Sequence, residues 1–161
     1  MFIDEIKKIA KTQKIDLFFD MDGVLVEYIN DPNKERYNLG TNFYTYGRPV
    51  LTMIKLAKRF SRIPNVTVHI LSNCPLEEQI EQKTNWLKIH APFFKKENIH
   101  IICYEKLVFE KEEKPFLKPK FLKDNFGDKT VFLIEDDLRN IKSTNTFYKE
   151  RIAYHISSLL K

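Results

Sequence analysis

Short apolar runs alternate with amphipathic segments along most of the chain. Four runs rich in Val, Ile, Leu and Phe have the length of buried strands. They lie at residues 15–19, 66–71, 99–103 and 130–134. Segments with apolar residues at helical spacing precede and separate them. We predict helices at residues 2–13, 49–60, 75–90, 119–125 and 138–149, and a last strand at 151–156.

This alternation predicts an α/β domain, Rossmann-like, with three α/β/α layers and a mostly parallel sheet. The 161 residues fit a single domain spanning 1–161. Residues 27–47 interrupt the pattern with Asn, Asp, Pro and Gly mixed with aromatic residues. We interpret this stretch as an irregular insertion of about 20 residues rather than as a second domain.

Composition and charge narrow the class of protein. The net charge of +5 favours anionic partners such as phosphate esters, nucleotides or nucleic acid, although many lysines alternate with Glu as on a solvated surface. Cys74 and Cys103 form no CxxC pair, and we read them as reduced thiols. No apolar run approaches the roughly 20 residues that cross a bilayer. We therefore expect a cytoplasmic protein without membrane contact.

Polar residues follow three of the predicted strands. Asp20 and Asp22 come after the first strand, Ser72 and Asn73 after the second, and the acidic residues 135–137 after the fourth. Ligands of open α/β sheets bind beyond the carboxyl ends of the strands. The sequence therefore predicts that these side chains converge at one edge of the sheet.

The paired acids indicate a metal site. A carboxylate directly after a buried strand loses hydration unless it is paired or bound to a metal. Asp20 and Asp22 are separated by one residue, and Gly23 permits a tight turn, so both can face one cation. Mg²⁺ prefers hard oxygen ligands, and an acid from residues 135–137 would complete the set. The alternative, a polar turn that only ends a strand, does not explain the two later polar clusters.

Three segments carry a family resemblance. Phe18-Phe19-Asp20-Met21-Asp22-Gly23-Val24 resembles the first motif of the haloacid dehalogenase (HAD) superfamily. Ile70-Leu71-Ser72-Asn73 resembles the second motif, and Phe132-Leu133-Ile134-Glu135-Asp136 resembles the fourth. The resemblance implies a phosphatase in which Asp20 attacks phosphorus and forms an aspartyl-phosphate. It implies that Asp22 protonates the leaving oxygen and then activates water.

The resemblance also implies ligands for the metal and the phosphate. Mg²⁺ would be held by the Asp20 carboxylate, the Asp22 backbone carbonyl and Asp136. Glu135 and Asp137 are the alternatives to Asp136, since the first acid of the fourth motif is Glu where Asp or Gly is more usual. Ser72 and Asn73 would bind phosphoryl oxygens.

The third motif of the superfamily is a lysine that neutralises the nucleophile and the phosphate. The candidates are Lys114, Lys118, Lys120 and Lys123, which all precede the fourth strand. We choose Lys118, because Lys118-Pro119 opens a short predicted helix as family lysines often do.

Two further stretches suggest a subfamily. Lys83-Thr-Asn-Trp86-Leu-Lys-Ile-His90-Ala-Pro92 resembles a segment of 5'(3')-deoxyribonucleotidase-type members, and Leu133 to Ile141 is similar to their LIDDxxxN run. The implied substrate is a small phosphorylated molecule, a (deoxy)nucleoside monophosphate. Residues 27–47 would be a minimal cap. Its aromatic residues either stack on a base or close a hydrophobic cluster. They are Tyr28, Tyr37, Phe43, Tyr44 and Tyr46.

Two other functions stay open at this stage. One is a phosphatase of nucleic-acid 3' ends or of phosphoproteins, which the positive charge permits. The other is a non-catalytic module that binds phosphate or nucleic acid, although such a module has no need for both Asp20 and Asp22. A P-loop kinase and a Rossmann dehydrogenase are disfavoured because neither glycine fingerprint is present.

Overall fold

The computed structural model describes residues 2–27, 44 and 47–159. In this part of the chain, five strands form one sheet in the order β3-β2-β1-β4-β5, and each pairs in parallel with its neighbours. The strands are β1 (Ile15–Phe19), β2 (Val66–Cys74), β3 (Ile99–Cys103), β4 (Thr130–Glu135) and β5 (Ala153–His155). The predicted α/β fold with a parallel sheet is confirmed.

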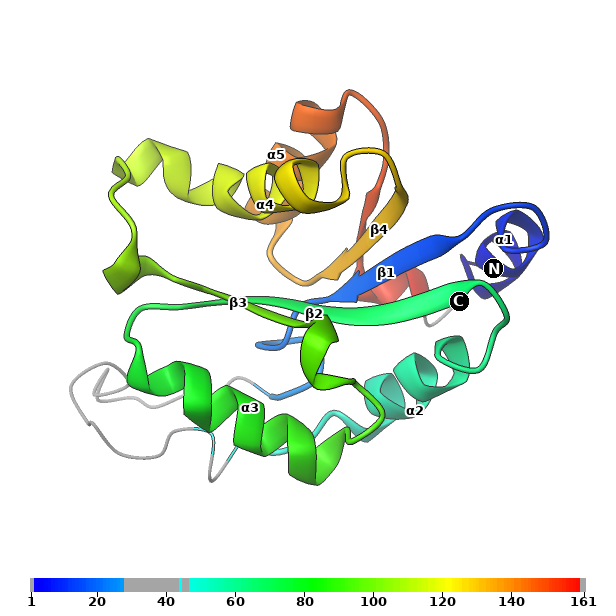
Figure 1. Ribbon diagram of the computed structural model, residues 1–161, viewed down its shortest axis with the longest axis horizontal. Helices are drawn as coiled ribbons and strands as arrows, with labels where there is room; N and C mark the ends of the chain where they lie inside the picture. Colours follow the sequence, from blue (N-terminus) through cyan, green and yellow to red (C-terminus); the bar gives the residue numbers. More distant parts are fainter. Residues whose placement is uncertain (1, 28–43, 45–46, 160–161) are drawn as a thin grey trace.

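Helices cover both faces of the sheet, which gives the predicted three layers (Figure 1). On one face, α1 (Phe2–Ile9), α2 (Leu51–Phe60) and α3 (Glu78–His90) contribute to the larger hydrophobic cluster. On the other face, α4 (Leu117–Phe126) and α5 (Leu138–Tyr148) pack over the smaller one. A 3-10 helix, Lys111–Phe116, leads directly into α4.

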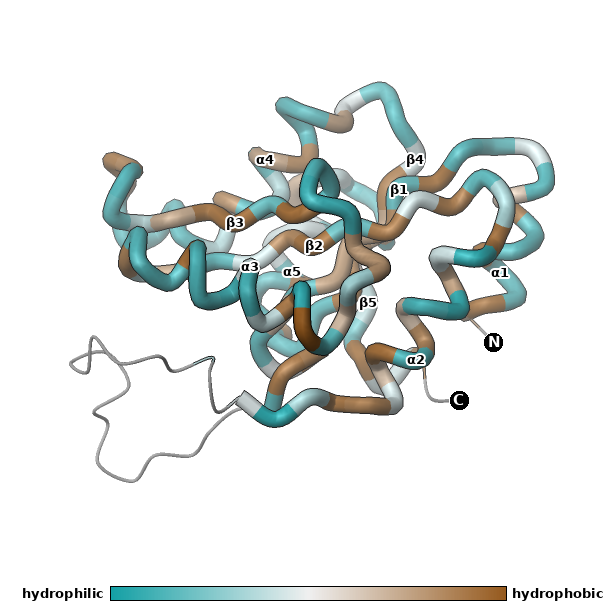
Figure 2. The backbone as a smooth tube through the Cα atoms, turned by 60° about the horizontal axis from the view of Figure 1, so that its bottom comes forward, coloured by the Kyte–Doolittle hydropathy of each residue, from teal (hydrophilic) through white to brown (hydrophobic). Residues whose placement is uncertain are grey.

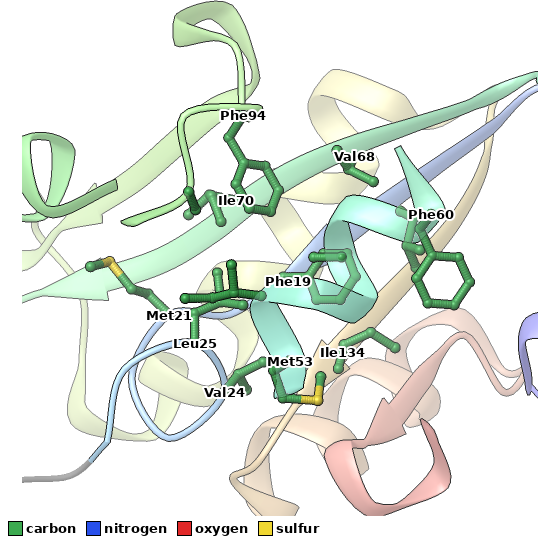
Figure 3. Close-up of a cluster of buried hydrophobic side chains, with 14 of the residues drawn as sticks. Phe19, Met21, Val24, Leu25, Met53, Phe60, Val68, Ile70, Phe94 and Ile134 are labelled. Atoms are coloured by element: carbon green, nitrogen blue, oxygen red, sulfur yellow. The ribbon is translucent and has the colours of Figure 1, made fainter. Parts of the chain in front are cut away.

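Strand β1 lies at the centre of the sheet and is buried along its whole length. Successive side chains of a strand point to opposite faces. Phe19 therefore lies in the larger cluster beside Met53 and Phe60 (Figure 3), whereas Phe18 belongs to the smaller one. The hydrophobic colouring of β1 and β2 in Figure 2 marks this shared core. Apolar burial on both faces explains why the sequence of β1 is almost continuously hydrophobic.

The boundaries of several elements differ from those predicted. Strand β2 continues past Leu71 to Cys74, because Ser72 to Cys74 pair with Ile101 to Cys103 of β3. The pairing satisfies the backbone of these polar positions, which side-chain composition alone does not reveal. Helix α4 begins at Leu117, two residues before the predicted start.

The predicted insertion at 27–47 falls largely on residues outside those that the structure describes. Glu27, Tyr44 and Gly47 are described, and Tyr44 and Gly47 are buried. Tyr28, Tyr37, Phe43 and Tyr46 are not, so their predicted role in stacking or packing stays a prediction. Among the described helices, none has the length and apolar character needed to cross a membrane.

Candidate active site

The carboxyl ends of β1 and β4 meet where the order of the sheet reverses direction. From β1 the chain proceeds outward to β2 and β3, then returns to β4 on the other side. Such a switch point leaves a crevice between the outgoing connections, where ligands of parallel sheets bind. Asp20 follows the last residue of β1, and its backbone N–H donates to the carbonyl of Ile134 on β4 at 2.9 Å.

Asp20 is buried and faces the layer formed by α4. Its Oδ1 lies 3.0 Å from Nζ of Lys118, the second residue of α4. Lys118 is only 2% exposed, and its ammonium group also donates to Oε2 of Glu135 at 2.6 Å. Burial lowers the pKa of Lys118, but the carboxylates of Asp20 and Glu135 outweigh this effect and hold the pKa above its ordinary value. Lys118 therefore carries a proton and a positive charge.

The other lysines considered for the third motif lie elsewhere. Lys114 and Lys120 are exposed: Nζ of Lys114 lies 4.5 Å from the centre of the Tyr104 ring, and Lys120 pairs with Glu113 at 3.0 Å. Lys123 is exposed in α4. Of the four candidates, Lys118 is the one that lies beside Asp20, where the third-motif lysine is expected from the sequence.

Three carboxylates meet beside Lys118. One oxygen each of Asp20, Glu135 and Asp136 lies within 4.8 Å of the other two. Burial and the negative charge of Glu135 raise the pKa of Asp20 to about 7, against the opposing effect of Lys118. The ammonium of Lys118 thus does not fully neutralise the cluster.

Glu135 is fully buried and accepts four hydrogen bonds. Its Oε2 accepts from Lys118 and from Nδ2 of Asn140 at 3.3 Å, and its Oε1 accepts from the backbone N–H groups of Asp136 and Asp137 at 3.2 and 3.4 Å. These bonds fix the turn after β4 that carries Asp136. Glu135 therefore holds Asp136 and Asp137 in place, and it would do so whether or not one of its oxygens also binds a metal.

Asp137, the other alternative ligand, has a different task. Its side chain caps α5 by accepting from the backbone N–H of Arg139 at 2.8 Å, and it pairs with the Arg139 guanidinium at 2.8 Å. Capping satisfies one of the free N–H groups of the first helical turn. Asp137 lies outside the described group of possible metal ligands.

The second acid of the motif lies in a tight loop after β1. Gly23 has a φ of 74°, a conformation that other residues adopt only with strain, and its N–H donates to the carbonyl of Val26 at 2.8 Å. The loop buries Val24 and Leu25 and leaves the Asp22 side chain 27% exposed. Oδ1 of Asp22 accepts from the hydroxyl of Tyr44 at 2.8 Å.

A second buried lysine joins Asp22 to the end of β2. Lys83 of α3 is fully buried, and its ammonium donates to Oδ2 of Asp22 at 2.5 Å and to Oγ of Ser72 at 2.8 Å. Ser72 Oγ thus accepts from Lys83 and keeps its own O–H to donate to a bound anion. Two ammonium groups, from opposite layers, therefore flank the acids of the first motif.

Sequence reasoning did not assign Lys83 to the site, because it sought the lysine only among those just before the fourth strand. A signal was present. Lys83 shares the buried face of α3 with Gln79, Trp86 and Leu87, at the spacing of one helical stripe. A lysine on the apolar face of the helix that follows Ser72 has no water to reach, so it needs a carboxylate or an anionic ligand.

Asn73 lies on β2 beside Tyr104, a residue that sequence analysis also left out. Burial raises the pKa of the Tyr104 phenol to about 12, while the charge of Lys118 and a hydrogen bond with Asn73 act in the opposite direction. The charges of Asp20 and Lys83 also act on this phenol, so Tyr104 interacts electrostatically with the residues of the site. Tyr104 follows β3 directly, so a fourth strand end contributes to the same edge.

The donor set fits a magnesium ion. Adjacent and opposite ligands of octahedral Mg²⁺ are about 3 and 4 Å apart, which agrees with carboxylate oxygens within 4.8 Å of one another. When all four are ionised, Asp20, Asp22, Glu135 and Asp136 supply four negative charges against the two positive charges of Lys83 and Lys118. A divalent cation would balance them. A bound cation would also favour the ionised form of Asp20.

Comparison with known proteins yields a structural likeness. No protein-family model and no curated protein matches the sequence. Among solved structures, a chain in the "Structure of the Pnkp1/Rnl/Hen1 RNA repair complex" is similar, with a TM-score of 0.65 and 13% sequence identity. The likeness covers 89% of this chain and 42% of that chain. This chain thus spans less than half of the protein it resembles, and the likeness extends to the fold.

Proposed function

We propose that this chain is a magnesium-dependent phosphomonoester hydrolase that works through an aspartyl-phosphate on Asp20. The observation that carries the proposal is the position of Asp20 between Lys118 and the acids Glu135 and Asp136, at the switch point of the sheet. A buried carboxylate beside a cation and a group of hard oxygen donors is suited to attack a phosphoryl group.

The residues would divide the reaction as follows. An oxygen of Asp20 attacks phosphorus, the bond from phosphorus to the ester oxygen breaks, and Asp22 gives a proton to that leaving oxygen. Asp22 then takes a proton from water, which attacks the aspartyl-phosphate and releases phosphate. Asp20, Asp136 and the Asp22 backbone carbonyl would hold Mg²⁺, which when bound would supply positive charge to the phosphoryl group.

Two lysines would bind the phosphoryl group from opposite sides. Lys83 and Ser72 are hydrogen-bonded to each other next to the Asp22 loop. Their N–H and O–H groups would donate to two phosphoryl oxygens. Lys118 would donate to the phosphoryl group from the other side, where its ammonium lies beside Asp20. Asn73, next to Ser72, would add an amide donor. Charge-assisted hydrogen bonds of this kind are about twice as strong as neutral ones.

The first candidate substrate is a (deoxy)nucleoside monophosphate, on the resemblance of Lys83 to Pro92 and Leu133 to Ile141 to deoxyribonucleotidase-type sequences. The second is the phosphorylated 3' end of a nucleic acid. The net charge of +5 and the likeness to a chain of an RNA repair complex favour it.

The proposed reaction is tested with p-nitrophenyl phosphate, with and without Mg²⁺. Wild-type protein should release p-nitrophenol only with the metal, and Asp20→Asn should abolish release. Asp128→Asn, which changes an exposed carboxylate, is the matched control and should behave as wild type. Equal activity of wild type and Asp20→Asn would rule out Asp20 as nucleophile. If no phosphate were released from any phosphomonoester tested, the proposal that the protein is an enzyme would be rejected.

The two substrate classes are then compared at equal Mg²⁺. A panel of nucleoside and deoxynucleoside 3'- and 5'-monophosphates is run beside short oligonucleotides that carry a 3'-phosphate. A higher kcat/KM for mononucleotides supports the first candidate, and a higher value for oligonucleotides supports the second.

A further inference from the structure

Both carboxylate oxygens of Asp22 accept a hydrogen bond, one from a neutral donor and one from a charged donor. Tyr44 donates its O–H to Oδ1 at 2.8 Å, and the ammonium of Lys83 donates to Oδ2. The two bonds come from different parts of the chain and fix the rotation of the carboxylate plane. Asp22 nevertheless remains 27% exposed, so the fixed carboxylate is open on one side.

Tyr44 itself is rigidly placed. Its side chain is 5% exposed and belongs to the larger hydrophobic cluster, and the Lys83 ammonium lies 4.8 Å from the centre of its ring. Gly47 supports it, since its N–H donates to the Tyr44 carbonyl at 3.3 Å. Trp86 of α3 in turn donates its indole N–H to the Gly47 carbonyl at 2.8 Å.

Close packing at Gly47 keeps this arrangement tight. A methyl group in place of its hydrogen would come within 2.7 Å of Cγ2 of Val26 in the loop that carries Asp22, and within 3.4 Å of the Trp86 indole nitrogen. Tyr44 is therefore held between the Asp22 loop and α3. Small displacements of this segment would move the hydroxyl away from Asp22.

The Tyr44 hydroxyl is the donor in its bond with Asp22, since its O–H donates to Oδ1 of the carboxylate at 2.8 Å. A buried hydroxyl needs a hydrogen-bond partner. A bond from Tyr44 to a backbone carbonyl would contribute to stability alone. The Tyr44 hydroxyl instead contacts Asp22, the residue to which the proposed function assigns proton transfer.

We infer that Tyr44 is a positioning residue, which orients the carboxyl group of Asp22 for proton transfer to the leaving oxygen. The inference rests on the proposed function. It also links residues 27–47 to the chemical step, because Tyr44 lies in that insertion and contacts the catalytic loop directly. Tyr44 would thereby influence the rate and not only the choice of substrate.

The test separates two esters by the basicity of their leaving groups. p-Nitrophenolate leaves readily without a proton, whereas an alkoxide such as that of glycerol phosphate requires one. For Tyr44→Phe, which keeps the ring against Lys83, kcat/KM should fall about three- to tenfold for the alkyl ester, as expected for the loss of one hydrogen bond. It should fall less than about twofold for p-nitrophenyl phosphate. kcat/KM reports on the steps up to leaving-group departure, before the common hydrolysis of the aspartyl-phosphate.

Two further variants separate positioning from packing. Tyr44→Leu removes ring and hydroxyl and should lower the Tm as well, while Tyr44→Phe should keep the Tm of wild type within about 2 °C, the shift caused by a fraction of one hydrogen bond. In Asp22→Asn, adding Tyr44→Phe should cause no further loss on the alkyl ester, since Tyr44 acts through Asp22.

An equal loss on both esters, or no loss on either, would overturn the inference while the wild-type activity left the proposed function intact. A wild-type protein without activity on any ester would overturn the proposed function itself. The two failures are thus distinguishable in one set of measurements.

Discussion

Lys83 shows how a single buried charge is tolerated inside the α3 layer. Its side chain has no exposed surface, yet its ammonium reaches Asp22 and Ser72. Burying an ammonium without a partner costs several kcal/mol, so the lysine and the acid require each other. When a phosphate dianion binds, it would become a third partner for the same ammonium.

Replacement of Lys83 by Met removes this charge but keeps an unbranched chain of similar length. We expect kcat/KM for p-nitrophenyl phosphate to fall about 10- to 100-fold, the loss of a hydrogen bond from a charged group. The matched control is Lys88→Met, on the exposed face of the same helix. Equal activity of the two variants would contradict a role for Lys83 in phosphate binding.

The adjacent acids Asp136 and Asp137 allow a second test at this scale. Asp136→Asn removes a charged metal ligand, so we expect the Mg²⁺ concentration for half-maximal activity to rise about tenfold or more. Asp137→Asn keeps a good helix cap and should leave that concentration unchanged. Titration of both variants with Mg²⁺ decides between the two positions. A larger shift for Asp137→Asn would reverse the assignment.

At the scale of the elements, β1, β2 and β3 are joined by a polar cluster that lies before the carboxyl ends of these strands. His69 Nε2 lies 2.7 Å from Oδ1 of Asp16, and His69 Nδ1 lies 3.3 Å from Nε2 of His100. Phe18 stacks on His69, with 4.6 Å between the ring centres. This cluster lies on the face of the sheet that α4 covers.

The cluster predicts a pH-dependent stability. Burial and the nearby His69 lower the pKa of His100 to about 4, so the folded protein favours the neutral ring. As the pH falls below about 6.5, the ordinary pKa, the unfolded chain takes up the proton first and is favoured. The free energy of unfolding should therefore be level above pH 7 and decrease towards pH 4.

Urea unfolding between pH 5 and 7 measures this slope. His100→Gln should make it shallower, whereas His155→Gln, at the end of β5, should not. An unchanged slope in His100→Gln would contradict the assignment.

The elements also show what the sequence reveals and where it fails. The apolar runs of β1 and β3 predict both strands to the residue, because each strand is mainly hydrophobic and is bounded by polar or turn-forming segments. Asp20 and Lys118 follow from motif position and helix start. Lys83 and Tyr44 do not, since their contacts with Asp22 join residues distant in the chain. Local periodicity places Lys83 on the buried face of α3, but it does not indicate which distant residue Lys83 contacts.

At the scale of the whole molecule, the acidic cluster predicts that Mg²⁺ stabilises the fold. A ligand that binds only the folded protein adds about 2.7 kcal/mol at 100 times its Kd. We expect Mg²⁺ to raise the Tm of the wild type and not that of Asp20→Asn, measured by thermal unfolding without any substrate. K⁺ at equal ionic strength is the control. Equal shifts in both proteins would place the cation elsewhere.

The central position of β1 has a consequence for how the protein acquires its activity. Ile15 pairs with Val66 on one side and with Thr130 on the other, so the strand that carries Asp20 is completed only by a partner near the far end of the chain. Closing such long loops makes folding slow. A ribosome-bound chain that has emerged as far as β3 lacks Lys118, Glu135 and Asp136 altogether. The proposed phosphatase activity would therefore appear last during refolding, once the entire sheet has assembled.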